Sequence, residues 1–269
     1  MIAGTRRYSG GMPARRDKET RFQRGYLEID FPSAPFDSAW KLLRDSARVY
    51  FANFGFLAAI TLAIFLPAKA ALQLVFYWLD VSKSGLGAYL GMDLSDLILD
   101  SLVVPAAIYG LLGYFRTGKT APIGRSLQWG WRQWPKMLWT KFKVEITITL
   151  WGAVFLVPGI VAMVRLAFTD PIVAIEADRE SAVLNRSRDL SRGRGWRIFA
   201  VLVPTLIVEL AGPFLALDAI GGATASRPLL ALIDSLLSVG GQWATVIVLM
   251  MYLGTVPAVQ PATAKHKRG

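Results

Sequence analysis

The chain has 269 residues, of which 54% are hydrophobic, and a formal net charge of +11 at pH 7. The apolar residues come in long blocks separated from the basic residues, a pattern typical of a membrane protein and not of a soluble domain. The sequence contains no cysteine, which excludes a disulfide framework, a thiolate nucleophile and a cysteine-type zinc site.

The two ends of the chain are polar and basic. Residues 1–33 are rich in Gly, Arg and Lys without apolar periodicity, so we predict a flexible basic tail there. They lack the short apolar core of a secretory signal peptide, and we expect the amino terminus to stay in the cytoplasm. Residues 34–256 are predicted to form one six-span membrane domain, followed by a short basic tail over residues 257–269.

Six apolar segments lie in this domain, each near the roughly 20 residues that an α-helix needs to cross a bilayer. We predict an all-α, polytopic fold with six transmembrane helices in three hairpins. Pro158-Gly159 is expected to turn the chain between the third and fourth helices, which carry charged residues and are alternatively tilted, short or partly re-entrant. The six segments cover residues 52–76, 97–115, 138–157, 160–176, 196–217 and 229–253.

An amphipathic segment precedes each predicted hairpin, and we expect each to form a helix lying flat on the membrane. Gly193 is expected to end the third of these helices. Aligning Ala121 with Ala182 superimposes Arg125-Ser126 on Arg186-Ser187, which suggests an internal repeat of about 61 residues; convergence of basic amphipathic helices is the alternative. The predicted apolar faces are Trp40, Leu43, Ala47, Tyr50 and Phe54 in residues 37–54; Ile123, Leu127, Gly130, Trp131 and Trp134 in residues 120–134; and Val183, Leu184 and Leu190 in residues 181–192.

The basic residues are distributed asymmetrically. Of the 30 Lys and Arg residues, all but Lys69, Lys83, Arg165 and Arg227 lie in four segments that share one side if both termini are cytoplasmic, residues 1–48, 116–143, 177–197 and 254–269. The positive-inside rule therefore predicts a multi-pass protein of the inner cell membrane with both termini in the cytoplasm.

Residues 185–196, NRSRDLSRGRGW, concentrate arginine on the predicted cytoplasmic face. Arginine offers a planar, bidentate donor set, so the stretch indicates a site for an anionic lipid headgroup or another anion. Arginines that only determine topology are the alternative. We predict no nucleic-acid partner, because a basic patch hemmed in by apolar spans has little free surface for a duplex. The candidate anion or headgroup ligands are Arg125, Arg186, Arg188, Arg192 and Arg194.

Ionisable residues inside apolar segments form a second group of candidates, because charges at membrane depth are costly and usually face a bundle interior or water. Closed ion pairs would indicate a structural role, whereas a polar cavity at the bilayer midplane would indicate a pathway for a solute or proton. Glu176, at the cytoplasmic end of the fourth predicted span, is expected to pair with Arg186. The principal candidates are Arg165, Asp170, Glu209 and Asp234, and Lys69, Asp100, Glu145 and Asp218 complete the set.

The residue inventory argues against catalysis. His266 is the only histidine and lies in the carboxyl-terminal tail, so neither a Ser-His-Asp arrangement nor a histidine metal cluster can be assembled. We therefore predict no enzymatic activity, no catalytic residue, no cofactor and no metal site.

Residues 157–199 contain Pro158-Gly159, Glu176, Arg186-Ser187, Gly193 and Trp196 in a pattern that resembles a known family. The family is the membrane domain fused to some bacterial glycerophosphodiester phosphodiesterases, which also has many stand-alone relatives. The resemblance implies a six-span bacterial membrane protein over about residues 35–256. It also implies a structural role for the motif residues named above. In fused members the phosphodiesterase is a separate soluble domain, for which this chain has no length left, so the resemblance implies no activity here.

These features together predict an accessory or scaffold membrane domain whose cytoplasmic face engages anionic membrane lipid or a protein partner. A transporter or permease for a small solute or lipid is the alternative function.

Overall fold

The structure is a computed structural model that describes residues 38–80, 86–176, 182–219 and 227–256, with the side chains of the ninth helix described as far as Ile207. The predicted tails over residues 1–33 and 257–269 lie outside these ranges. Within them the chain forms helices joined by turns, and no strand is present, which confirms the all-α fold class. The helices are α2 (Ala39–Ala52), α3 (Phe54–Trp78), α4 (Leu86–Thr117), α5 (Ile123–Val154), α6 (Leu156–Leu166), α7 (Thr169–Ile175), α8 (Val183–Ser191), α9 (Gly195–Ala219) and α10 (Arg227–Thr255).

Among the described residues, four helical regions are long and apolar enough to cross a membrane. They cover Phe54–Trp78, Gly91–Thr117, Leu156–Ile175 and Pro228–Thr255, and they correspond to the first, second, fourth and sixth predicted spans. These apolar helices are compatible with an integral membrane protein.

The structure does not confirm six spans in three hairpins. The third predicted span lies in α5, where Lys141, Lys143 and Glu145 interrupt the apolar sequence. The fifth lies in α9, whose described apolar part, Gly195–Ile207, is shorter than a span. The fourth is not one straight helix, because α6 ends at Leu166 and α7 begins only at Thr169.

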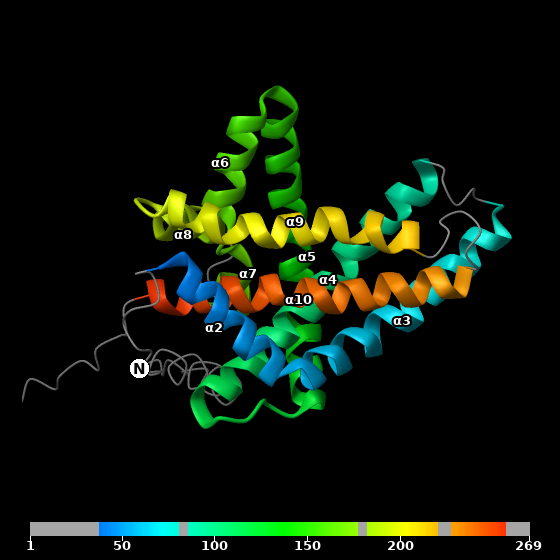
Figure 1. Cartoon of the computed structure of the whole chain (residues 1–269), viewed down its shortest axis with the longest axis horizontal. Coiled ribbons are helices and arrows are strands. Elements are labelled where there is room, and N and C mark those ends of the chain that lie inside the picture. Colours follow the sequence, from blue (N-terminus) through cyan, green and yellow to red (C-terminus); the bar gives the residue numbers. More distant parts are fainter. Residues whose placement is uncertain (1–37, 81–85, 177–181, 220–226, 257–269) are drawn as a thin grey trace, which may run out of the picture. The chain divides into compact units, whose positions relative to one another are not determined.

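The core lies where α3, α4 and α5 meet. Ile60, Phe65, Val103 and Ala106 are buried there, and Leu127 of α5 packs against them. In Figure 1, α9 and α10 run side by side in opposite directions, and α10 also packs against α3.

Large apolar side chains are exposed along several helices. On α3 they include Leu74, Tyr77 and Trp78, the last of which is 78% exposed. Such a surface would drive aggregation in water, whereas lipid tails cover it without cost. The exposed apolar surface therefore agrees with a membrane environment.

In residues 37–54 the apolar face predicted to lie on the membrane is exposed at Trp40 and Phe54, but Tyr50 of that face is buried against the protein. Helix α2 buries Leu42, Ser46 and Tyr50, whereas Trp40 is 74% exposed and Phe54 46% exposed. The buried face packs against α9 and α10, and the hydroxyl of Tyr50 donates a hydrogen bond to the carbonyl oxygen of Val239 in α10 at 3.0 Å. The same face accepts a hydrogen bond at Ser46 from the indole N–H of Trp243 at 3.1 Å, so polar contacts as well as apolar packing join α2 to the protein.

The extent of the predicted helix over residues 120–134 is corrected, because it is the first part of the continuous helix α5. Its predicted face includes Ile123 and Trp131, which are 41% and 63% exposed, while Ser126 and Gln133 are buried. In lipid surroundings small and polar residues meet neighbouring helices and bulky apolar ones can face outward. An apolar stripe is then a poor guide to the packed side of the helix.

The turn predicted at Pro158-Gly159 lies three residues earlier. Phe155 has extended backbone angles, φ −154° and ψ 139°, and separates α5 from α6. Pro158 falls in the first turn of α6, where its missing N–H costs nothing. A Cβ atom on buried Gly159 would lie only 2.7 Å from the Cα atom of Gly152, so the two glycines let the arms of the α5–α6 hairpin approach closely (Figure 1).

Two glycines of α5 provide a test of its packing against α4. A Cβ atom on Gly130 would lie 2.6 Å from the carbonyl oxygen of Leu102 and 2.9 Å from Cβ of Ala106, whereas one on Gly124 would meet no atom within 4 Å. We expect Gly130→Ala to lower the free energy of unfolding in detergent by about 1–3 kcal/mol through overpacking. Gly124→Ala should leave it unchanged or raise it by up to about 1 kcal/mol through helix propensity. Equal unfolding midpoints for the two variants would contradict this packing.

Candidate anion-binding groove

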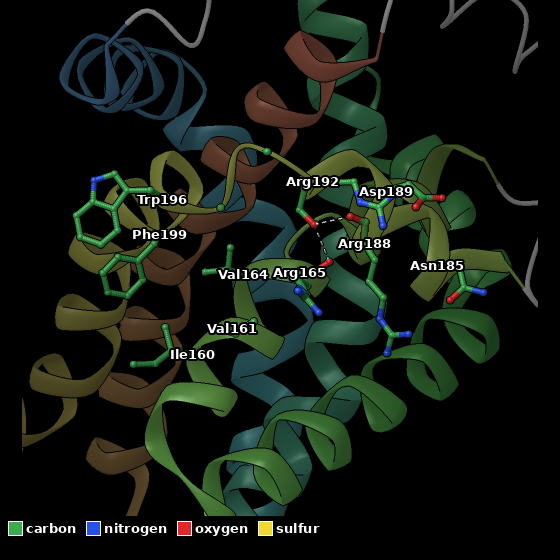
Figure 2. Close-up of a pocket in the computed structure, with 13 residues that line it drawn as sticks. Ile160, Val161, Val164, Arg165, Asn185, Arg188, Asp189, Arg192, Trp196 and Phe199 are labelled. Carbon is green, nitrogen blue, oxygen red and sulfur yellow. Dashed lines mark hydrogen bonds between the residues drawn. The ribbon is translucent and has the colours of Figure 1, made fainter.

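A groove of about 900 Å³ lies between α6, α8 and the first turns of α9. Figure 2 shows the guanidinium groups of Arg165 and Arg188 on one side of it and the rings of Trp196 and Phe199 on the other. We call it the arginine groove. Its lining consists of Ile160, Val161, Val164, Arg165, Asn185, Arg188, Asp189, Ser191, Arg192, Gly193, Gly195, Trp196 and Phe199.

Ser187 fixes the position of α8 against the break between α6 and α7. Its side chain is completely buried, accepts a hydrogen bond from the backbone N–H of Phe168 at 3.1 Å and donates one to the carbonyl oxygen of Arg165 at 2.9 Å. The hydroxyl of Ser191 lies 3.3 Å from the same carbonyl oxygen. Backbone groups that the helix break leaves without helical partners are thus satisfied by serines one turn apart.

Gly193 shapes the other end of α8. Its φ of +76° lies in the left-handed region that glycine adopts without steric cost, which confirms the predicted helix end. The turn is closed by a hydrogen bond from the N–H of Arg194 to the carbonyl oxygen of Ser191 at 3.1 Å. It carries the chain from Arg192, on the polar side of the groove, to Trp196 at the start of α9.

The groove is positively charged and amphipathic. Arg165, Arg188 and Arg192 are exposed, and none of them forms an ion pair with a residue that the structure describes. Asp189 supplies the single carboxylate among the described lining residues. Trp196 is 77% exposed, so an apolar surface lies beside the free guanidinium groups. This combination suits a ligand that has an anionic group joined to an apolar body.

The groove contains only part of the predicted set of anion ligands. Arg188 and Arg192 line it, but Arg125 on α5 and Arg194 in the turn do not. Arg165, which we predicted as an intramembrane polar residue, joins them instead. Sequence reasoning missed this because it treated residues 160–176 as one span, whereas the break after α6 brings α8 alongside Arg165.

Arg186 does not line the groove, and it meets Glu176, as the sequence predicted. Its Nε atom lies 3.5 Å from Oε1 of Glu176, a charge contact and not a close hydrogen bond. The hydroxyl of buried Tyr252 donates a hydrogen bond to the same carboxylate oxygen at 2.6 Å. Glu176 therefore connects α8 to α10 next to the groove.

The predicted intramembrane carboxylates lie in a different region, among α3, α4, α5, α7 and α10. Nζ of Lys69 lies 2.7 Å from Oδ2 of Asp234 and 2.5 Å from Oδ1 of Asp96. Lys141 lies 3.9 Å from Asp170. Asp96 was missed because it precedes the predicted span, although it lies one turn before Asp100 on the same face of a helix. The side chains of Glu209 and Asp218 are outside the described part of the structure.

Comparison with protein-family models, curated proteins and solved structures finds no match to this chain. The resemblance of residues 157–199 to the phosphodiesterase-associated membrane domain therefore stays a prediction.

Replacing Ser187 tests whether it anchors α8. Ser187→Ala leaves the N–H of Phe168 without its acceptor, and we expect a loss of about 1–3 kcal/mol in the free energy of unfolding. Ser101→Ala is the matched control, because this equally buried hydroxyl donates only to the carbonyl oxygen of Leu97 in its own helix, at 2.6 Å. Thermal unfolding in detergent compares the two variants. If Ser101→Ala is destabilised as strongly as Ser187→Ala, Ser187 does not anchor α8.

A double-mutant cycle tests the pair between Glu176 and Arg186. Because the side chain of Arg186 is 41% exposed, we expect a coupling free energy of only about 0.5–1 kcal/mol, decreasing with added salt. The charge swap Glu176→Arg with Arg186→Glu should recover part of the stability that either single change loses. Purely additive effects would show that the two charges do not interact.

Proposed function

We propose that the chain is a non-enzymatic integral membrane protein, an accessory or scaffold domain whose arginine groove binds the phosphate headgroup of an anionic lipid at the cytoplasmic face. The observation that carries the proposal is the placement of Arg165, Arg188 and Arg192 around one groove. Guanidinium groups match the phosphate oxygens in a bidentate geometry, and these three are available because they pair with no described residue.

The apolar side of the groove favours a lipid over a small soluble anion. Ile160 and Val161 of α6 continue from the arginines as an apolar wall, and Phe199 faces them from α9 (Figure 2). A headgroup held by the arginines would leave its acyl chains along this wall, where burial of apolar surface adds to the binding free energy. Trp196 belongs to the residue type that prefers the boundary between headgroups and tails.

A second candidate function, a permease for a small solute or lipid, is favoured by a separate observation. Asp234 lines a cavity of about 440 Å³ between the helices, and a transport pathway would need a polar cavity of this kind. Its ion pair with Lys69 is equally typical of a structural contact, so the scaffold function is preferred.

Lipid retention tests the groove directly. We expect native mass spectrometry of the detergent-solubilised protein to show bound phosphatidylglycerol in preference to phosphatidylcholine. The triple variant Arg165→Gln, Arg188→Gln, Arg192→Gln should weaken phosphatidylglycerol binding by about 10- to 100-fold, since each arginine contributes on the order of 1 kcal/mol. Added glycerol phosphate should compete far less well than the lipid if the apolar wall contributes.

The matched control is Arg125→Gln with Arg132→Gln, which removes two exposed arginines of α5 that do not line the groove. This variant should retain phosphatidylglycerol. An equal loss in both variants would mean that basic charge, and not the groove, attracts the lipid, and unchanged binding in the triple variant would refute the proposal.

A further inference from the structure

Acidic side chains gather around cavities between the helices, although the chain as a whole is basic. Two adjoining cavities of about 440 and 960 Å³ lie among α4, α5, α7 and α10, and both are lined by Asp96, Asp100, Lys141 and Asp170. Asp234 lines the smaller cavity, and Asp93 and Glu145 line the larger one. We call this pair of cavities the acidic chamber.

The described charges of the acidic chamber do not balance. Six carboxylates line it, of which Asp93 and Glu145 are exposed and the four others half-buried, whereas Lys141 is the single lining cation among the described residues. Lys69, from α3, adds a second ammonium group, which lies 2.5 Å from Oδ1 of Asp96 and 2.7 Å from Oδ2 of Asp234. Lys141 approaches Asp100 and Asp170 only to 3.8 and 3.9 Å. The half-buried carboxylates exceed their two ammonium partners, and a further cation, or a proton, would stabilise them.

Gln242 provides independent evidence for a ligand with hydrogen-bond donors. Its side chain is 2% exposed and lines the smaller cavity, yet its Oε1 atom accepts no hydrogen bond within the described structure. Buried carbonyl oxygens are rarely left without a donor. A ligand that carries N–H groups would satisfy Gln242 and neutralise the neighbouring carboxylates together.

We propose that the acidic chamber binds an organic cation with one or two primary ammonium groups. No three carboxylates of the described residues converge as metal ligands do, which disfavours a divalent metal ion. The smaller cavity has the size of a small-molecule site, and Val104 and Ile108 give it an apolar wall for the methylene groups of an aliphatic amine. Lys69 already places one primary ammonium between two aspartates of the same chamber.

The roles within the chamber follow from these distances. Asp96 and Asp234 are held by Lys69, so they fix the wall between α3, α4 and α10. Asp100 and Asp170 contact a cation only loosely, and they are assigned to the ammonium group of the ligand. Gln242 accepts a further N–H hydrogen bond. The site is distinct from the arginine groove and its existence does not depend on lipid binding or on transport.

Isothermal titration calorimetry of the full chain in detergent tests this site, with 1,4-diaminobutane as the probe. We expect the diamine and butylamine to bind, and the neutral isostere 1,4-butanediol and Mg²⁺ not to bind. Asp100→Asn and Asp170→Asn should each weaken diamine binding about tenfold or more, because each removes a charge-assisted hydrogen bond. Gln242→Leu should weaken it by a smaller factor. Asp45→Asn, in α2 beside Arg48, should leave the affinity unchanged.

Three results would overturn the proposal: no heat of binding for the diamine with the unchanged protein, tighter binding of Mg²⁺ than of the diamine, or equal affinities for Asp45→Asn and the two chamber variants. Thermal unfolding and size-exclusion profiles show whether each variant is folded. If Asp170→Asn does not fold, Asp100→Asn and Gln242→Leu still decide the outcome, because they alter different walls of the chamber. Loss of lipid binding in the groove variants would leave this measurement unaffected.

Discussion

The contact between Lys69 and the two aspartates Asp96 and Asp234 is the interaction on which the helical arrangement depends. It joins α3, α4 and α10, three of the helical regions apolar enough to cross a membrane, through a side chain that is 2% exposed. An ammonium group in such surroundings is tolerated only beside opposite charge, so the three helices have one register in which Lys69 is compensated. The packing of Phe65 and Val103 into the core is then set by the same register.

A second constraint is that backbone N–H and C=O groups need other hydrogen-bond partners where a helix is interrupted. The break between α6 and α7 leaves a donor on Phe168, and Ser187 satisfies it while also bonding to the carbonyl oxygen of Arg165. The same serine therefore holds α8 in place and brings Arg165 near Arg188. The hydrogen bonds at the helix break thus also place the three arginines around one groove. The groove therefore lies next to the break.

Part of this arrangement was predictable from the sequence. Long apolar blocks located the four span-like regions, Gly193 marked the end of α8, and Glu176 was matched with Arg186, because these features depend on local composition and spacing. The buried faces of α2 and α5 were not predictable from an apolar stripe, since lipid is as apolar as the core. Asp96 and the placement of Arg165 depend on contacts between distant segments, which one sequence does not show.

The hydrogen bond from Tyr252 to Glu176 has a consequence for topology mapping. The last described helix carries both this tyrosine and Asp234. A product shortened before Tyr252 leaves Glu176 without its hydroxyl donor, and one shortened before Asp234 also leaves Lys69 with Asp96 as its one described carboxylate partner. Reporter enzymes attached to progressively truncated chains would then report the orientation of a mispacked protein. Insertion of the reporter into loops of the intact chain keeps both contacts and reads the native orientation.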